Sequence, residues 1–229
     1  VKNNELANPG LLDIKNFSNN KTKNVAQTIS SITRRHLLEN NGVALGQCLT
    51  AVGWVGNTVP ELTQGDGLVE LSMDDTSGNG LAVGYALAGR RPIFIVRYQG
   101  FQWFDAPFIA NYAAKSKELW GVSCPVFVRS VGMDGCIGPV ASNSHHGIFM
   151  RMPGIPICAP MTPGEYRWVW EYFMAHNNSM YVSEHRRSFK IDYEMPDQLN
   201  HMADITLFPI SSTRLDAIEA AKILAKKGI

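Results

Sequence analysis

The sequence has little that would point to a membrane, a nucleic acid or a disulfide scaffold. None of its apolar runs approaches the ~20 residues of a membrane-spanning helix. A formal net charge of +1 gives no electrostatic reason to expect nucleic acid or an anionic membrane as a partner. Its 4 cysteines lack CxxC spacing, which predicts reduced thiols in a cytoplasmic compartment and gives a zinc site only weak support.

The composition is that of a globular protein with one substantial α/β domain. The chain has 229 residues, of which 45% are hydrophobic and 18% charged. An Asn- and Lys-rich arm is expected at 1–22, and the main domain at 23–200. Residues 201–229 read as a strand at 204–210 and an amphipathic helix at 213–227, which predicts the start of a truncated second α/β domain.

Between these ends, apolar runs alternate with helical patterns. Strands that are apolar throughout, rather than alternating, are typical of a parallel sheet covered by helices on both faces. The expected helices are 25–39, 78–89, 104–119 and 163–177, and the expected strands are 43–45, 68–73, 92–97, 125–129, 155–159 and 180–184.

Polar and aromatic residues follow several of these strands, where parallel sheets collect their ligands. Asp74 and Asp75 precede a helix of small residues, and an aromatic-rich segment at 98–104 follows the next strand. Such an arrangement would hold a flat, polar heterocycle between an acid and a stacking ring. The alternative is that both carboxylates only cap the helix.

The same residues resemble the pyrimidine-binding half of thiamine diphosphate enzymes, closest to the beta subunit of the decarboxylating component of 2-oxo-acid dehydrogenases. The resemblance runs from about residue 25 to the C-terminus and rests on several short matches in order. These are D-T-S-G-N-G-L-A-V-G at 75–84, R-P at 91–92, N-Y-A-A-K at 111–115, P-G-I at 153–155, A-P at 159–160 and V-S-E at 182–184. It implies the thiamine-diphosphate-binding fold.

The resemblance also implies roles for individual residues. Asp75 stands where the family has a glutamate that hydrogen-bonds the aminopyrimidine ring and activates the cofactor, although aspartate is shorter by about 1.5 Å. Phe101 falls at the ring that stacks on the pyrimidine, and Tyr98 would shape the same pocket. His145 and His146 resemble the family's histidine that faces the thiazolium and the substrate.

Each of these interpretations has a plainer alternative. Phe101 alone is consistent with an ordinary core residue, and His145 and His146 with a surface loop. Gln47 lies where the family usually carries glutamates of an acid network, so that network is expected to be incomplete. The G-D-G at 65–67 lacks the asparagine of a diphosphate and magnesium motif, so no diphosphate site is expected in this chain.

The resemblance therefore predicts a beta-type subunit that works with a separate alpha-type subunit. The partner would bind the diphosphate of thiamine diphosphate together with Mg²⁺, in an alpha2beta2 assembly acting on a small-molecule 2-oxo acid by decarboxylation and acyl transfer. Alternatives are a split transketolase-like or acyloin-forming transferase, and a non-catalytic subunit that keeps the fold. An anionic substrate would suit Arg97, Arg186 and Arg187, and the interface candidates are Trp54, Trp103, Trp168 and Trp170.

Overall fold

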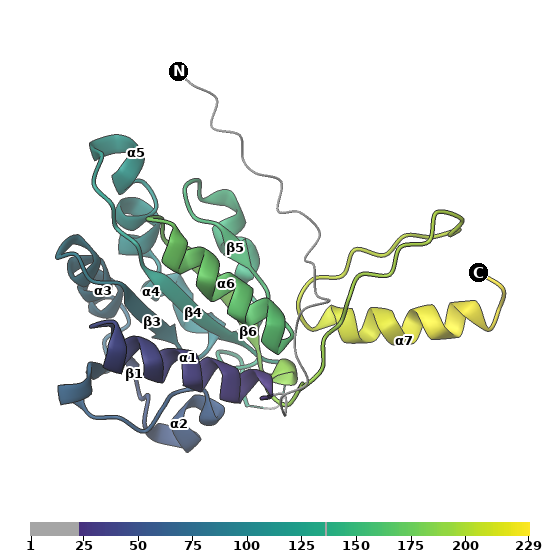
Figure 1. The fold of residues 1–229 in the computed structure, drawn as a ribbon, viewed down its shortest axis with the longest axis horizontal. Helices are drawn as coiled ribbons and strands as arrows, with labels where there is room; N and C mark the ends of the chain where they lie inside the picture. The colour runs from purple at the N-terminus through teal and green to yellow at the C-terminus, as the bar shows by residue number, and fades with distance from the viewer. Residues whose placement is uncertain (1–22, 136) are drawn as a thin grey trace.

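A sheet of six parallel strands forms the centre of the molecule, in the order β2-β1-β3-β4-β6-β5 (Figure 1). The computed structural model describes residues 23–135 and 137–229, so the predicted arm at 1–22 lies outside the described residues. The strands are β1 Val43–Gln47, β2 Leu68–Leu71, β3 Pro92–Val96, β4 Phe127–Gly132, β5 Ile157–Cys158 and β6 Met180–His185. All their pairings are parallel, which confirms the predicted fold class.

Helices cover both faces of this sheet. They are α1 Val25–Glu39, α2 Ala51–Asn57, α3 Ser77–Leu87, α4 Gln102–Asp105, α5 Ser116–Trp120, α6 Pro163–Ala175 and α7 Thr213–Ala225, with a π-helix at Ile109–Ala113. Successive side chains of a strand point to opposite faces. In β3, Ile93 and Ile95 accordingly pack with α1 and α6, whereas Phe94 and Val96 pack with α3 and the π-helix.

The strand order places a switch point between β1 and β3. The chain continues from β1 to β2 on one side, whereas β3 lies on the other side of β1 and leads on to β4. In open parallel sheets the crevice for a ligand lies beyond the carboxyl ends of the strands at such a point. Gln47 ends β1, and Arg97 directly follows β3, so the segments that follow these two strands border the crevice.

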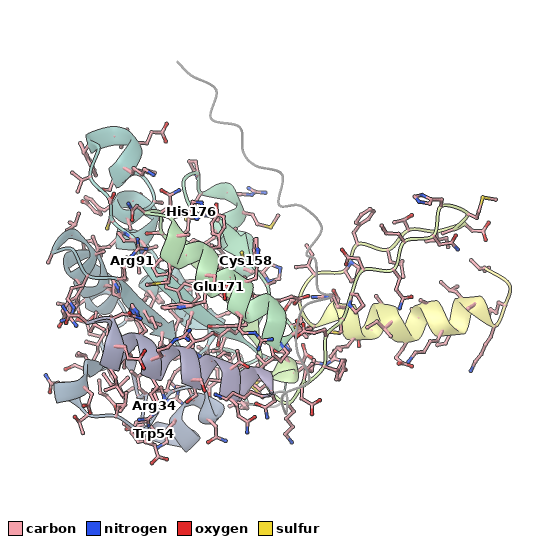
Figure 2. All side chains as sticks on the ribbon, in the orientation of Figure 1. Arg34, Trp54, Arg91, Cys158, Glu171 and His176 are labelled. Carbon is pink, nitrogen blue, oxygen red and sulfur yellow. The ribbon has the colours of Figure 1, made fainter. Side chains whose placement is uncertain are left out.

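Local capping chemistry explains why several helices begin or end where they do. Asn24 and Gln27 form a reciprocal capping box at the start of α1, and its bounds agree with the prediction of 25–39. At the end of α6, the Arg91 guanidinium donates to the carbonyl oxygens of Phe173 and His176, both at 2.9 Å (Figure 2). A cation at a helix C-terminus satisfies carbonyls that have no partner within the helix.

The prediction of one continuous helix at 104–119 is wrong. The chain instead forms α4, the π-helix and α5 in succession. Pro107 cannot donate a backbone hydrogen bond and so interrupts the helical ladder. The next amide, that of Phe108, donates to the side-chain oxygen of Asn79 in α3 at 2.8 Å. This bond holds the chain against α3 at the point where the helix is interrupted.

The strand predicted at 204–210 is also absent from the described structure, and this segment runs as an exposed connection. A strand needs a neighbour to satisfy its backbone groups, and no described strand pairs with this segment. The helix predicted at 213–227 is present as α7, which lies to one side of the sheet domain (Figure 1). The assignment of 201–229 to a second domain stays a prediction.

Candidate functional site

The residues predicted to form the site follow β2, β3 and β4, whose carboxyl ends lie at one edge of the sheet. Asp75 lies between β2 and α3, while Tyr98 and Phe101 follow β3. His145 and His146 lie in the long loop after β4. These five side chains are all half-buried rather than sealed in the core. Their roles in binding or catalysis stay predictions.

The two adjacent carboxylates have different environments. Asp74 is exposed, and its Oδ1 accepts hydrogen bonds from the amides of Thr76 at 3.0 Å and Ser77 at 3.3 Å. These bonds cap α3 and lower the pKa of Asp74. Asp75 instead accepts a hydrogen bond from Gln47 Nε2 at 3.1 Å, through its Oδ1. The capping alternative therefore applies to Asp74, and Asp75 is oriented by the end of β1.

A third carboxyl group, that of Asp105, was not predicted from the sequence as part of the site. It lies close enough to Asp74 and Asp75 to interact with their charges. Asp105 ends α4 and is 6% exposed, and its Oδ1 is buried without a hydrogen-bond partner among the described residues. Burial, followed by the charges of Asp75 and Asp74, raises the pKa of Asp105 to about 8. At neutral pH this side chain is therefore mostly a neutral carboxylic acid beside a carboxylate.

This raised pKa predicts a pH-dependent gain in stability for Asp105→Asn. The unfolded chain releases the proton near pH 4, whereas the folded chain keeps it up to about 8, so the wild type loses stability as pH rises between these values. Asparagine is neutral throughout. By pH 8.5 the variant should be more stable by about 5 kcal/mol, with little difference at pH 4. Urea unfolding at both pH values measures this, and an equal difference at both would contradict it.

The aromatic part of the site follows β3. The rings of Tyr98 and Phe101 lie 6.2 Å apart between centroids, and Phe101 also packs against the core on the α3 face. Phe101 is therefore partly a core residue, which was the plainer alternative to a stacking role. It is not fully buried, however. Only glycine fits at position 100, because a Cβ there would collide with the Val140 carbonyl. The loop after β4 therefore closes directly onto this segment.

Two buried glutamines hold that loop in place. The Gln99 side-chain oxygen accepts from the His145 amide at 2.5 Å, and Gln102 Nε2 donates to the His145 carbonyl at 2.6 Å. The other ends of both amides bond to polar groups at the carboxyl ends of β4 and β6, among them Ser130 and Ser183. Gln102 also accepts from the Tyr181 hydroxyl. Because these bonds join residues far apart along the chain, no periodic pattern in the sequence indicates them.

The two adjacent histidines point to different neighbours. The ring of His145 meets Trp103 edge-on, with centroids 5.9 Å apart. His146 Nδ1 lies 3.4 Å from Ser183 Oγ at the end of β6, and burial lowers its pKa. His146 is therefore neutral near pH 7, the form in which imidazole can accept a proton.

A further histidine, His185, directly follows the strand predicted at 180–184, and neither the residue pattern nor the resemblance assigned it a role. It is 1% exposed, and its Nδ1 accepts the Arg187 amide at 3.2 Å, so Nε2 carries the hydrogen. That Nε2 lies 3.2 Å from an oxygen of Asp134 in the loop after β4. Burial lowers the pKa of His185 and Asp134 partly opposes this. The contact joins the β6 end to the loop that carries His145 and His146.

The described surface also carries two grooves. One of about 510 Å³ lies on α1 and α6 and is lined by residues such as Arg34 and Glu171 (Figure 2). The other, of about 380 Å³, is lined by Trp103, Asn111 and Arg151 among others. Asp75 and Phe101 line neither groove. The second groove nevertheless adjoins the predicted site, because Trp103, which lines it, meets the ring of His145.

The described part of the chain holds no group of three or more His, Cys, Asp and Glu side chains arranged to bind a metal ion. Among the same residues, no helix combines the length and apolarity that crossing a bilayer requires. Cys48, Cys124 and Cys158 carry free thiols, and Cys136 lies outside the described residues.

Comparison with known proteins identifies the fold and the family. Residues 77–191 match the family described as "Transketolase, pyrimidine binding domain". The chain is 25% identical over 179 residues to the beta subunit of acetoin:2,6-dichlorophenolindophenol oxidoreductase of Cupriavidus necator, covering 72% of this chain and 53% of that protein. It is 24% identical over 183 residues to the mitochondrial pyruvate dehydrogenase E1 component subunit beta of Dictyostelium discoideum, covering 72% and 51%.

Among solved structures, one described as "Split gene transketolase, inactive beta4 tetramer" superposes with a TM-score of 0.62. It shares 13% sequence identity and covers 91% of this chain and 69% of its own, a likeness that shows the fold alone. The chain spans about half the length of the curated relatives it matches. Because the segment at 77–191 makes up half of the chain and includes α3, β3, β4 and β6, the chain belongs to the transketolase pyrimidine-binding domain family.

Proposed function

We propose that this chain is the beta-type, pyrimidine-binding subunit of a heteromeric thiamine diphosphate enzyme that acts on a 2-oxo acid by decarboxylation and acyl transfer. The observation that carries this proposal is the Asp75 carboxylate. Asp74 takes over the capping of α3, and Gln47 fixes one oxygen of Asp75 at the switch point of the sheet. The name of one relative, a pyruvate dehydrogenase subunit, supports a 2-oxo acid as substrate. The name of another, a subunit of an acetoin oxidoreductase, supports only reaction at a carbon next to a carbonyl group.

The residues present fit the pyrimidine end of the cofactor. Asp75 Oδ2 accepts no hydrogen bond from any described residue, so it is free to receive a ring N–H or to hold a ring proton. Phe101 is half-buried at the carboxyl end of β3, and His146 offers a neutral imidazole near the end of β6. When bound, thiamine diphosphate supplies a carbon nucleophile that adds to a carbonyl group. Asp75 would hold the pyrimidine, Phe101 would pack on it, and His145 or His146 would serve the substrate.

The diphosphate and its Mg²⁺ are proposed to bind to an alpha-type partner, in an alpha2beta2 assembly. An exposed apolar surface on the segment after β3 supports such a partner, and its large members are Trp103, Phe104, Phe108, Tyr112, Leu119 and Trp120. Of the tryptophans suggested from the sequence, Trp103 is 60% exposed and belongs to this surface. Trp170 is only 4% exposed and is a core residue, so that suggestion was wrong.

Reconstitution with the diphosphate-binding partner tests this function. With thiamine diphosphate and Mg²⁺ added, the complex should consume a 2-oxo acid and reduce an artificial electron acceptor, and this chain alone should not. Turnover of sugar phosphates or acyloin formation without 2-oxo acid decarboxylation would replace the proposal with the split transferase alternative. An intact complex that binds the cofactor through the partner but turns over none of these substrates would make this chain a non-catalytic subunit.

A further inference from the structure

Three arginines at the carboxyl edge of the sheet, Arg97, Arg186 and Arg187, were expected to suit an anionic substrate. In the structure they differ in whether they already pair with a carboxylate. Arg187 already has anionic partners. Its guanidinium donates to both oxygens of Asp216, at 2.9 and 3.1 Å, and lies 3.6 Å from Asp134. Arg97 and Arg186 form no ion pair with any described residue, although both are half-buried.

Arg97 and Arg186 both contact the ring of Tyr98. The guanidinium carbons of Arg97 and Arg186 both lie 5.3 Å from the centroid of Tyr98. Arg97 follows β3 and Arg186 follows β6, the two strands that flank β4, and both guanidinium groups contact the Tyr98 ring. Cation–π contact with Tyr98 holds both in place but cannot neutralise them.

Each of these arginines also has an unused donor. The Nε atoms of Arg97 and Arg186 are buried and have no hydrogen-bond partner among the described residues. A buried donor without an acceptor is destabilising, and two positive charges that contact the same ring also repel each other. A carboxylate or phosphate group would satisfy the unpaired donors and neutralise the repulsion, because its paired oxygens match the N–H fork of a guanidinium.

We propose that Arg97 and Arg186, aligned by Tyr98, form a binding site for a carboxylate or phosphate group of the substrate. This rests on the proposed function. The site lies beside the predicted cofactor ring, because Tyr98 is 6.2 Å from Phe101 between ring centroids. Neither arginine is used by the network that orders the loop of His145 and His146.

The location and charge of the site narrow the class of substrate. Ion pairing to two arginines stabilises a carboxylate in the ground state, which opposes its loss as carbon dioxide. The site therefore suits a second anionic group, at the other end of the substrate from the reacting carbon. The substrate class is a 2-oxo acid that carries a distal carboxylate or a phosphate.

Titration calorimetry on the full chain tests the site without any turnover. The probes are glutarate for the carboxylate and inorganic phosphate for the phosphate, with neutral glutaramide as control. At low salt one of the two anions should bind and glutaramide should not. The tighter anion assigns the distal group. Binding should weaken by about tenfold or more in Arg97→Met and in Arg186→Met, since each loses a charge-assisted pair.

Arg187→Met is the matched control, because its guanidinium is already paired with Asp216. Its affinity should stay within about twofold of wild type. If a methionine variant fails to fold, Arg97→Lys and Arg186→Lys keep the charge but lose the fork, and they should still weaken binding severalfold. Absence of binding by both anions, or an equal loss in Arg187→Met, would overturn the site. Because no cofactor enters this titration, its failure is distinguishable from failure of 2-oxo acid turnover.

Discussion

Replacing Arg129 with methionine should lower the free energy of unfolding by about 3–5 kcal/mol. Arg129 is 0% exposed in β4, and its guanidinium donates to both oxygens of Glu184 in β6, at 2.6 and 2.9 Å. It also donates to Thr58 at 2.8 Å, and Tyr166 of α6 donates to the same carboxylate at 2.6 Å. Burial alone would lower the pKa of Arg129, but Glu184 more than offsets this and keeps it above its usual value.

The cost arises because the substitution leaves the Glu184 carboxylate buried without a counter-charge. Urea unfolding of Arg129→Met at pH 7 measures it. The double variant Arg129→Met/Glu184→Gln, which removes both charges, should recover a substantial part of the loss. Arg187→Met, which breaks an exposed pair with Asp216, should cost no more than about 1 kcal/mol. A loss below 1 kcal/mol in Arg129→Met would show that the pair is not essential.

Asp75→Ala should reduce 2-oxo acid turnover by the reconstituted complex by about 100-fold or more. The proposed role of this carboxylate is to hold the pyrimidine ring and its proton, and alanine can do neither. Asp75→Glu supplies the longer acid seen in the family and should retain activity. Steady-state turnover at saturating cofactor is the measurement.

Asp74→Ala is the control for the neighbouring acid. It removes the bonds to the Thr76 and Ser77 amides, so it should cost about 1 kcal/mol of stability while leaving turnover within a few-fold of wild type. If turnover in Asp75→Ala matched the wild type, Asp75 would have no part in the mechanism, and the non-catalytic alternative would gain support.

The fold was largely predictable because its determinants are local. The helices predicted at 25–39 and 163–177 begin where α1 and α6 begin, and the apolar strands implied a covered parallel sheet. The errors occurred where local pattern and tertiary context disagreed. Pro107 breaks a helix that the pattern of apolar residues favoured, and 204–210 has strand-like composition but no partner strand.

The candidate site was predictable only in outline. A family resemblance located Asp75, Phe101 and the two histidines, but it could not say which of two adjacent carboxylates would cap α3. That choice follows from Gln47, a residue distant in sequence that meets Asp75 only in the folded sheet. Asp105 and the Arg97–Tyr98–Arg186 arrangement likewise depend on contacts between elements far apart along the chain.

The attachment of α7 determines how this helix can move. Its side-chain bonds to the rest of the described chain come from its first turn, where Arg214 pairs with Glu165 and Asp216 with Arg187. The second pair is exposed and therefore screened by salt, whereas the first is sheltered and persists. Raising the ionic strength should therefore weaken the Arg187–Asp216 contact first, so that α7 stays attached mainly through Arg214.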